Sequence, residues 1–237
     1  MRLAEWVAVN GGIVHREAAA LAGYGAAAVR AASRAGAVEI VRRSWVATSD
    51  APAELRLAAA AGGRIACVSA ARHREWWVPH DVDARVHLRL APHAASDGIP
   101  PDFAGIVHWT KAVAPAPRHQ LLESVEDSLA HIAACLDRET ALVLWESAVK
   151  VERLDVEALR AIRWPSRAAH ACAHETQGLS DSGLETIFVT RLRHWGIPIV
   201  QQVYIAGRPV DALIGKRLVV QIDGYAHHSS SDRKSVV

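Results

Sequence analysis

The chain has 237 residues, 51% of them hydrophobic, and a formal net charge of +2. This length and apolar content exclude a disordered chain and allow one large or two modest domains. The net charge alone does not indicate nucleic-acid binding, but its distribution is uneven: 6 basic against 3 acidic side chains in residues 1–49, 14 against 17 in 50–179, and 7 against 5 in 180–237.

The cysteines and the N-terminus bear on the cellular compartment. The chain has three cysteines, an odd number, without a C-x-x-C pair, which argues against a disulfide framework. Its N-terminus lacks a long apolar stretch, and the alanine-rich run near residue 58 is interrupted by arginine and glycine. We therefore expect a cytoplasmic protein with no signal peptide and no membrane span.

The first fifty residues alternate short helical patterns with glycine-rich breaks. Three helices and one strand with a central turn are predicted, over residues 2–9, 15–22, 25–35 and 38–47. Three short helices followed by a basic hairpin are typical of a winged helix-turn-helix, here assigned to residues 1–50.

Four arginines of this unit are candidate DNA contacts. Arg30 and Arg34 lie on the third helix, which would enter a major groove, and Arg42 and Arg43 lie at the hairpin turn, which would meet phosphates. Arginine suits phosphate because its planar guanidinium donates in pairs. Winged helices also serve as protein-contact modules, and two arginines on an alanine-rich helix can simply be solvated, so both alternatives remain open.

Residues 51–165 are predicted to be an α-rich connector with a small β element. Helical patterns cover 52–61, 67–77, 118–135, 138–149 and 155–162, and strand patterns cover 84–90 and 105–110. Leu144 and Trp145 have the spacing of core residues. The sequence of the connector discloses no chemistry.

Residues 166–179 are small and polar, which predicts a linker before the last domain. His170, Cys172 and His174 lie within it, and two histidines flanking a cysteine invite a metal-site interpretation. No fourth ligand is near in sequence, so we interpret these histidines as incidental.

The last domain, residues 180–237, opens with a helix and a strand. Ser182 and Glu185 have the S-x-x-E spacing of a capping box. The apolar positions expected on one helix face are Leu184, Ile187, Phe188, Leu192 and Trp195. Gly196 ends the helix, and a strand is predicted over 199–205.

A β-hairpin follows, and its pattern selects its register. If Ile214 pairs with Leu218 across a three-residue loop, one set of apolar side chains falls on the same face: Val210, Ala212, Ile214, Leu218, Val220 and Ile222. Asp211, Gln221 and Asp223 then share the other face. Carboxylate and amide oxygens are the ligands of a hard cation such as Mg²⁺. The hairpin therefore predicts a candidate magnesium site.

The ordered motifs of residues 180–232 resemble a known nuclease family. The matching residues are Ser182-Gly183-Leu184-Glu185, Gln202, Ile205, Gly207, Val210-Asp211, Leu218 to Gly224, and His227-His228. This set resembles the very-short-patch-repair-endonuclease-like family of the PD-(D/E)XK nuclease superfamily. More weakly, the N-terminal region resembles the winged helix of abortive-infection type IV antitoxins. The expected fold is α/β (α+β), with a winged helix, a helical connector and a restriction-endonuclease-like αβββ core.

The resemblance implies a catalytic set. Asp211 would be the principal metal ligand, Glu185 the helix acid, and Gln221 the residue at the position of the second strand acid. Asp223 would stand at the position of the usual lysine and act as a second metal ligand, and His227 would handle protons. A phosphodiester needs a cation, here Mg²⁺, to offset charge on its oxygens and to make water nucleophilic. Histidine suits proton handling because its unperturbed pKa is near 6.5.

Two departures from the family pattern leave a second function open. Gln221 is neutral, so it brings no charge to hold a divalent ion, and a core of this family would continue past His228 into a further helix and strand. We expect the domain to be incomplete at its C-terminus. The sequence thus predicts a metal-dependent DNA endonuclease of repair or defence, with a DNA-binding regulator or antitoxin-like protein carrying an inactive nuclease-like domain as the alternative.

Overall fold

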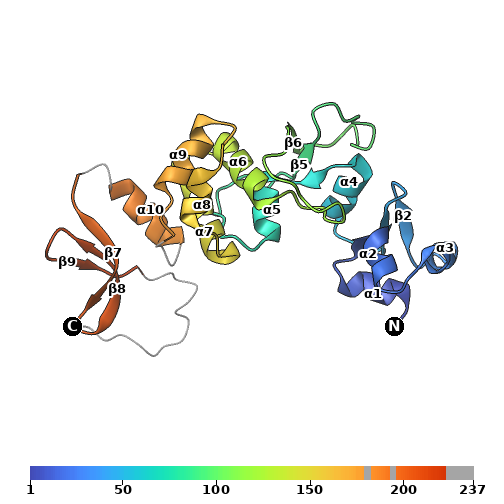
Figure 1. The fold of residues 1–237 in the computed structure, drawn as a ribbon, viewed down its shortest axis with the longest axis horizontal. Helices are drawn as coiled ribbons and strands as arrows, with labels where there is room; N and C mark the ends of the chain where they lie inside the picture. The colour runs from blue at the N-terminus through green and yellow to red at the C-terminus, as the bar shows by residue number, and fades with distance from the viewer. Residues whose placement is uncertain (179–182, 193–195, 223–237) are drawn as a thin grey trace.

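The computed structural model describes residues 1–178, 183–192 and 196–222 of the chain. It combines short helices with three small sheets of three strands each, which confirms an α+β protein. The units follow one another in chain order along the long axis of the molecule (Figure 1). Within the part described, no helix is both long and apolar enough to cross a membrane.

The N-terminal unit packs three helices on one small antiparallel sheet. In chain order its elements are α1 (Leu3–Val9), β1 (Ile13–His15), α2 (Arg16–Leu21), α3 (Ala26–Arg34), β2 (Glu39–Val41) and β3 (Trp45–Ala47). The strand order is β1-β3-β2, so β3 lies in the middle. Val7, Val29 and Val46 are almost completely buried between helices and sheet. The three helices and the hairpin predicted here are confirmed, whereas β1 was not predicted.

A second sheet lies beside the N-terminal unit. Its strands are β4 (Arg64–Ile65), β5 (His87–Leu90) and β6 (Ile106–Trp109). The same part of the chain contains the helices α4 (Ala53–Ala61) and α5 (Cys67–His73). The middle strand β5 pairs antiparallel with β4 and parallel with β6. Parallel pairing of consecutive strands requires the chain to cross over between them. The loop after β5 makes this crossing, which brings the histidines of β5 and β6 to neighbouring positions.

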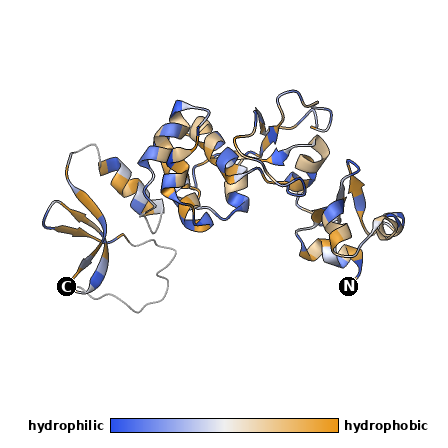
Figure 2. Cartoon of the chain, in the orientation of Figure 1, coloured by the Kyte–Doolittle hydropathy of each residue, from blue (hydrophilic) through white to orange (hydrophobic). Residues whose placement is uncertain are grey.

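Four helices build the central bundle: α6 (Val125–Cys135), α7 (Arg138–Glu152), α8 (Val156–Ala161) and α9 (Arg167–Glu175). Figure 2 shows hydrophobic and hydrophilic residues alternating around these helices, as expected for amphipathic helices that share a core. Leu144 and Trp145 are fully buried in this core, as predicted from their spacing. The indole N–H of Trp145 donates to the carbonyl of Leu129 at 3.1 Å, which satisfies its one polar atom.

The predicted linker at 166–179 is wrong for most of its length, because Arg167–Glu175 form helix α9. Ser166 caps this helix by accepting the Ala169 N–H at 3.1 Å, and α9 packs on α6 and α7. The small residues that suggested a linker are those that allow close packing: Ala169, Cys172 and Ala173 are buried in the core. The predicted helix 118–135 also begins later, at Val125, because Ser124 accepts the Asp127 N–H.

The C-terminal unit consists of α10 (Gly183–Leu192), β7 (Ile199–Ile205), β8 (Arg208–Ile214) and β9 (Leu218–Val220), with the strands in the order β7-β8-β9. Helix α10 packs on α7 of the bundle, and Arg191 and Glu139 form an ion pair of 2.9 Å between the two helices. The predicted apolar face of α10 is wrong at Leu184, which is 41% exposed. Glu185, Thr186 and Val189 are buried instead, because α10 lies against both α7 and a polar side chain of β7.

Candidate functional site

The register predicted for the C-terminal hairpin is confirmed. Ile214 pairs with Leu218 across the three-residue loop, and Ala212 pairs with Val220. Ala212 is buried, whereas Leu218 at the hairpin end is 58% exposed. On the other face, the side-chain amide of Gln221 donates to Asp211 Oδ2 at 3.0 Å. The structure thus brings Asp211 and Gln221 together, as the pattern of the strands predicted.

Asp211 also accepts a backbone hydrogen bond. The N–H of Ile222 donates to the same Oδ2 atom at 2.6 Å, and Asp211 is half-buried. Two N–H groups, one from a side chain and one from the backbone, therefore donate to one oxygen of Asp211. Asp223 and His227, the other strand acid and the histidine of the predicted site, lie outside the described residues.

Glu185 reaches this strand face through Gln202. The carboxylate of Glu185 is 5% exposed and accepts a 3.1 Å hydrogen bond from Gln202 Nε2. The neighbours of Gln202, residues 201 and 203, pair with Ala212 and Val210, so Gln202 occupies the register position opposite Asp211. Glu185 lies on α10, Gln202 on β7, Asp211 on β8 and Gln221 directly after β9, and we call these four residues the polar row.

The backbone at Gln202 departs from regular strand geometry. Its φ is +52°, a left-handed conformation that non-glycine residues rarely adopt. Such a conformation costs about 1–3 kcal/mol and persists where the surroundings hold it in place. Here the hydrogen bond to buried Glu185 supplies that constraint. The capping partner expected for Glu185, Ser182, lies outside the described residues.

The four arginines predicted to contact DNA all lie in the N-terminal unit, two on a helix and two at a hairpin turn. Arg30 and Arg34 are exposed on α3. Arg42 and Arg43 form the turn between β2 and β3, both with positive φ, and are also exposed. The guanidinium of Arg42 donates to the carbonyl of Ala60 at 2.9 Å, so this side chain is tied to the end of α4.

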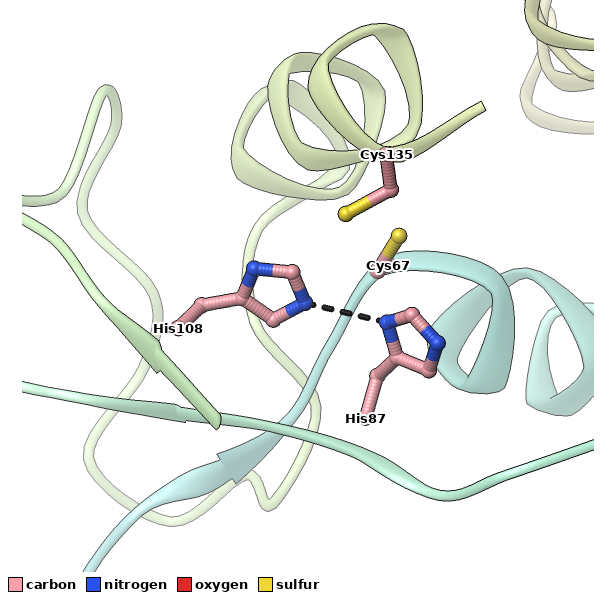
Figure 3. A group of neighbouring side chains, drawn as sticks. All are labelled: Cys67, His87, His108 and Cys135. Atoms are coloured by element: carbon pink, nitrogen blue, oxygen red, sulfur yellow. Dashed lines mark hydrogen bonds between the residues drawn. The ribbon is translucent and has the colours of Figure 1, made fainter. Parts of the chain in front are cut away.

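A second candidate site lies between the central sheet and the bundle, where sequence reasoning found none. Cys67, His87, His108 and Cys135 place one ligand atom each within 4.8 Å of one another. Figure 3 shows the two imidazoles facing each other and the two sulfur atoms beside them. His87 Nδ1 and His108 Nε2 are 3.0 Å apart. We call this group the Cys/His cluster; thiol and imidazole donors are able to hold a metal ion.

Each member of the Cys/His cluster comes from a different element. Cys67 is the first residue of α5 and Cys135 the last of α6, while His87 begins β5 and His108 lies within β6. The two histidines share a sheet face because His87 pairs with Ile106 across parallel strands, two residues before His108. Cys67 and His87 are buried, and Cys135 is exposed, so one side of the cluster faces solvent.

Buried polar groups surround the cluster. Glu123, fully buried, accepts the backbone N–H of Cys67 at 2.8 Å, and its two oxygens lie 3.1 and 3.0 Å from His131 Nδ1. The ring of His131 stacks on His108 with centroids 4.4 Å apart. The backbone N–H of His87 donates to Ser69 Oγ at 2.9 Å. These contacts hold the backbone or ring of three cluster members in place.

The two thiols of the cluster have opposite pKa shifts. Burial raises the pKa of Cys67. Hydrogen bonding with Cys67 is the main cause that lowers the pKa of Cys135 to about 5, with a further contribution from His87. Burial, followed by the neighbouring His131 and His87, lowers the pKa of His108 to about 3. Near neutral pH these shifts favour a thiolate at Cys135 beside an uncharged His108.

The metal interpretation of His170, Cys172 and His174 finds no geometric support. The two histidine rings lie 4.4 Å apart on the exposed side of α9, whereas Cys172 is buried in the core on the opposite side. Burial raises the pKa of the Cys172 thiol to about 11. The three side chains therefore do not converge, and Cys172 is a packing residue.

Sequence reasoning missed the Cys/His cluster because its members are far apart along the chain. The local signal was a histidine in each of two short apolar strands, HLRL and IVHW. No protein-family model matches the chain, and a search of curated proteins finds no significant match.

Proposed function

We propose that the chain binds DNA through its N-terminal unit and hydrolyses phosphodiester bonds at the polar row of its C-terminal unit. The observation that carries the proposal is the contact of Gln221 with Asp211, on the strand face that also leads to buried Glu185. An aspartate within a strand is poorly favoured unless a partner or function retains it. Here two carboxylates each accept a hydrogen bond from a glutamine amide, Glu185 from Gln202 and Asp211 from Gln221.

The donors of the polar row fit a hard divalent cation. Asp211 and Glu185 supply carboxylate oxygens, and Gln221 has an amide oxygen in addition to the N–H that contacts Asp211. Oxygen ligands of this kind are those that Mg²⁺ prefers. When bound, Mg²⁺ would offset the charge on phosphate oxygens and lower the pKa of a water molecule. Asp211 would hold the cation, and Gln221 would position the Asp211 carboxylate.

Two features of the N-terminal unit support DNA binding. The order α1, β1, α2, α3, β2, β3 is that of a winged helix, in which the third helix enters the major groove. Arg30 and Arg34 are exposed on this third helix, and Arg43 is exposed at the hairpin turn. Guanidinium groups on these two elements would meet phosphates on both sides of the groove.

Plasmid cleavage by the full-length chain tests the hydrolytic proposal. We expect nicking of supercoiled DNA that requires Mg²⁺ and falls on the order of 100-fold or more in Asp211→Ala. The matched control is Asp102→Ala, which removes an exposed aspartate from the loop before β6. Equal cleavage by wild type and Asp211→Ala would rule out the assigned site.

One contact favours the second function, DNA binding without cleavage. Both donors on Asp211 Oδ2 are neutral N–H groups, so the hairpin satisfies this carboxylate oxygen without a cation. A regulator or antitoxin-like protein with an inactive nuclease-like domain would retain salt-dependent DNA binding. It would show no Mg²⁺-dependent cleavage in the same plasmid assay, and its binding would depend on Arg30 and Arg34.

A further inference from the structure

We propose that Cys67, His87, His108 and Cys135 form a structural zinc site that joins the central sheet to the helical bundle. This site lies outside the polar row and does not depend on nuclease activity. Two thiols and two imidazoles are a ligand set typical of structural Zn²⁺. They are poor ligands for Mg²⁺ or Ca²⁺, which prefer oxygen.

The spacing of the donor atoms fits a tetrahedral ion. Zinc binds sulfur at about 2.3 Å and nitrogen at about 2.0–2.1 Å, so adjacent ligand atoms of a tetrahedron lie about 3.3–3.8 Å apart. The four ligand atoms of the Cys/His cluster lie within 4.8 Å of one another. Only small side-chain adjustments would therefore bring all four to bonding distance. Four protein ligands leave no open position for substrate, which is typical of a structural site.

The facing histidines indicate the same geometry. His87 Nδ1 and His108 Nε2 approach to 3.0 Å on neighbouring parallel strands. In a pair of neutral imidazoles, only one of two facing nitrogens carries a proton to donate. A cation between the two rings would satisfy both lone pairs at once. The two sulfur atoms lie together on one side of this pair in Figure 3, and all four ligand atoms are within 4.8 Å of one another.

Contacts with neighbouring residues fix the orientation of two of the four ligands, Cys67 and His108. Cys67 has a φ of +52°, and its N–H is held by Glu123 Oε1 at 2.8 Å. His108 stacks on His131, and His131 in turn contacts the buried Glu123 carboxylate. Outer contacts of this kind fix the orientation of the ligands and are a regular part of metal sites. Glu123 is thus a positioning residue for two of the four ligands.

A bound ion would connect α5, β5, β6 and α6 at one point. Because these elements span residues 67–135, the ion would bind the folded chain far more tightly than the unfolded one. The exposed side at Cys135 supplies an entry path for the metal. The ion would add to the hydrophobic packing of α5 on α6.

Metal analysis of the full-length chain, expressed with zinc in the medium, tests this proposal. We expect about one zinc ion per wild-type chain. Cys135→Ser and His108→Ala should each reduce the zinc content at least about tenfold, because each removes a direct ligand. Cys172→Ser is the matched control, since it removes a buried thiol that lies on α9, outside the cluster. Cys135 is exposed, so its variant tests the site without disturbing the core.

Cobalt substitution gives a second measurement. Co²⁺ in the wild-type chain should produce the strong visible bands of tetrahedral coordination and a thiolate charge-transfer band, and Cys135→Ser should weaken the latter. Wild-type protein without zinc and without these bands would overturn the proposal. Equal zinc loss in Cys172→Ser and Cys135→Ser would also overturn it.

Discussion

Gln221, directly after β9, donates its side-chain amide N–H to the carboxylate of Asp211 on β8 at 3.0 Å. The interaction places a neutral group beside the carboxylate that the family resemblance assigns to the metal. Ile222 adds a backbone N–H to the same oxygen. The charge at this point of the polar row therefore comes from Asp211, with Glu185 contributing from α10.

A second carboxylate at position 221 should make the hairpin sensitive to Mg²⁺. In Gln221→Glu, two like charges about 4 Å apart would cost about 1 kcal/mol at the surface, which lowers the melting temperature by about 2–4 °C. Mg²⁺ should reverse this loss, because a divalent ion between two carboxylates offsets their repulsion. Thermal unfolding with and without Mg²⁺ measures the effect. Gln221→Ala is the control. A melting temperature of Gln221→Glu that is the same with and without Mg²⁺ would contradict a cation site at Asp211.

Gly183→Ala should loosen the docking of α10. A Cβ atom at Gly183 would lie 2.2 Å from Cε3 of the Trp77 ring, too close for two carbon atoms that are not bonded to each other. Overpacking of this kind costs about 1–3 kcal/mol of unfolding free energy. The same substitution in a Trp77→Ala background should cost less, since the ring is gone. A double-mutant cycle by urea unfolding measures the coupling, and strictly additive effects would show that the two residues do not meet.

The arginines of the N-terminal unit should separate into two classes. Arg30→Ala with Arg34→Ala should weaken DNA binding and reduce the slope of log K against log salt by about 2, since each phosphate contact contributes about 0.9. Arg42→Ala should also lower the unfolding free energy by about 0.5–1.5 kcal/mol, because it loses the hydrogen bond to Ala60. Fluorescence anisotropy across a salt series, paired with urea unfolding, checks both. An unchanged salt slope in the double variant would exclude α3 from the interface.

Glu123→Gln should weaken zinc binding without removing a ligand. The substitution keeps an oxygen that can accept the Cys67 N–H but removes the negative charge beside His131. Loss of an outer contact typically weakens metal affinity about 10–100-fold. Competition with a chromophoric chelator measures this change. The control is Glu126→Gln, which changes a glutamate on the first turn of α6 and should leave the zinc affinity unchanged.

The hairpin register was predictable because its information is local. The pairing of Ile214 with Leu218 places one apolar set on one face, and the structure has this pairing: Val210, Ala212, Ile214, Leu218, Val220 and Ile222. The glycine breaks likewise marked the helices of the N-terminal unit. Strands β1 and β4 were missed because they are three and two residues long, and their pairing partners are distant: Ile13 pairs with Ala47, and Arg64 with Arg89.

The Cys/His cluster and α9 depend on tertiary contacts that no local pattern encodes. The cluster forms because β5 and β6 are parallel, which brings His87 next to His108, and because the ends of α5 and α6 meet above that sheet. Helix α9 is rich in alanine and polar residues, and its packing on α6 and α7 decides its structure. The small and polar composition of residues 166–179 therefore predicted a domain boundary, although the chain there continues into the core of the bundle.

The carboxylate of Glu146 lies within the bundle and accepts the backbone N–H groups of Gln177 at 2.8 Å and Gly178 at 2.7 Å. Residues 177 and 178, which follow α9, are thus hydrogen-bonded to a buried side chain of α7. A truncation just before residue 177 would remove both of these backbone donors from the Glu146 carboxylate. Dividing the protein within residues 166–179, where its composition suggests a linker, would therefore destabilise the fragment that carries α7.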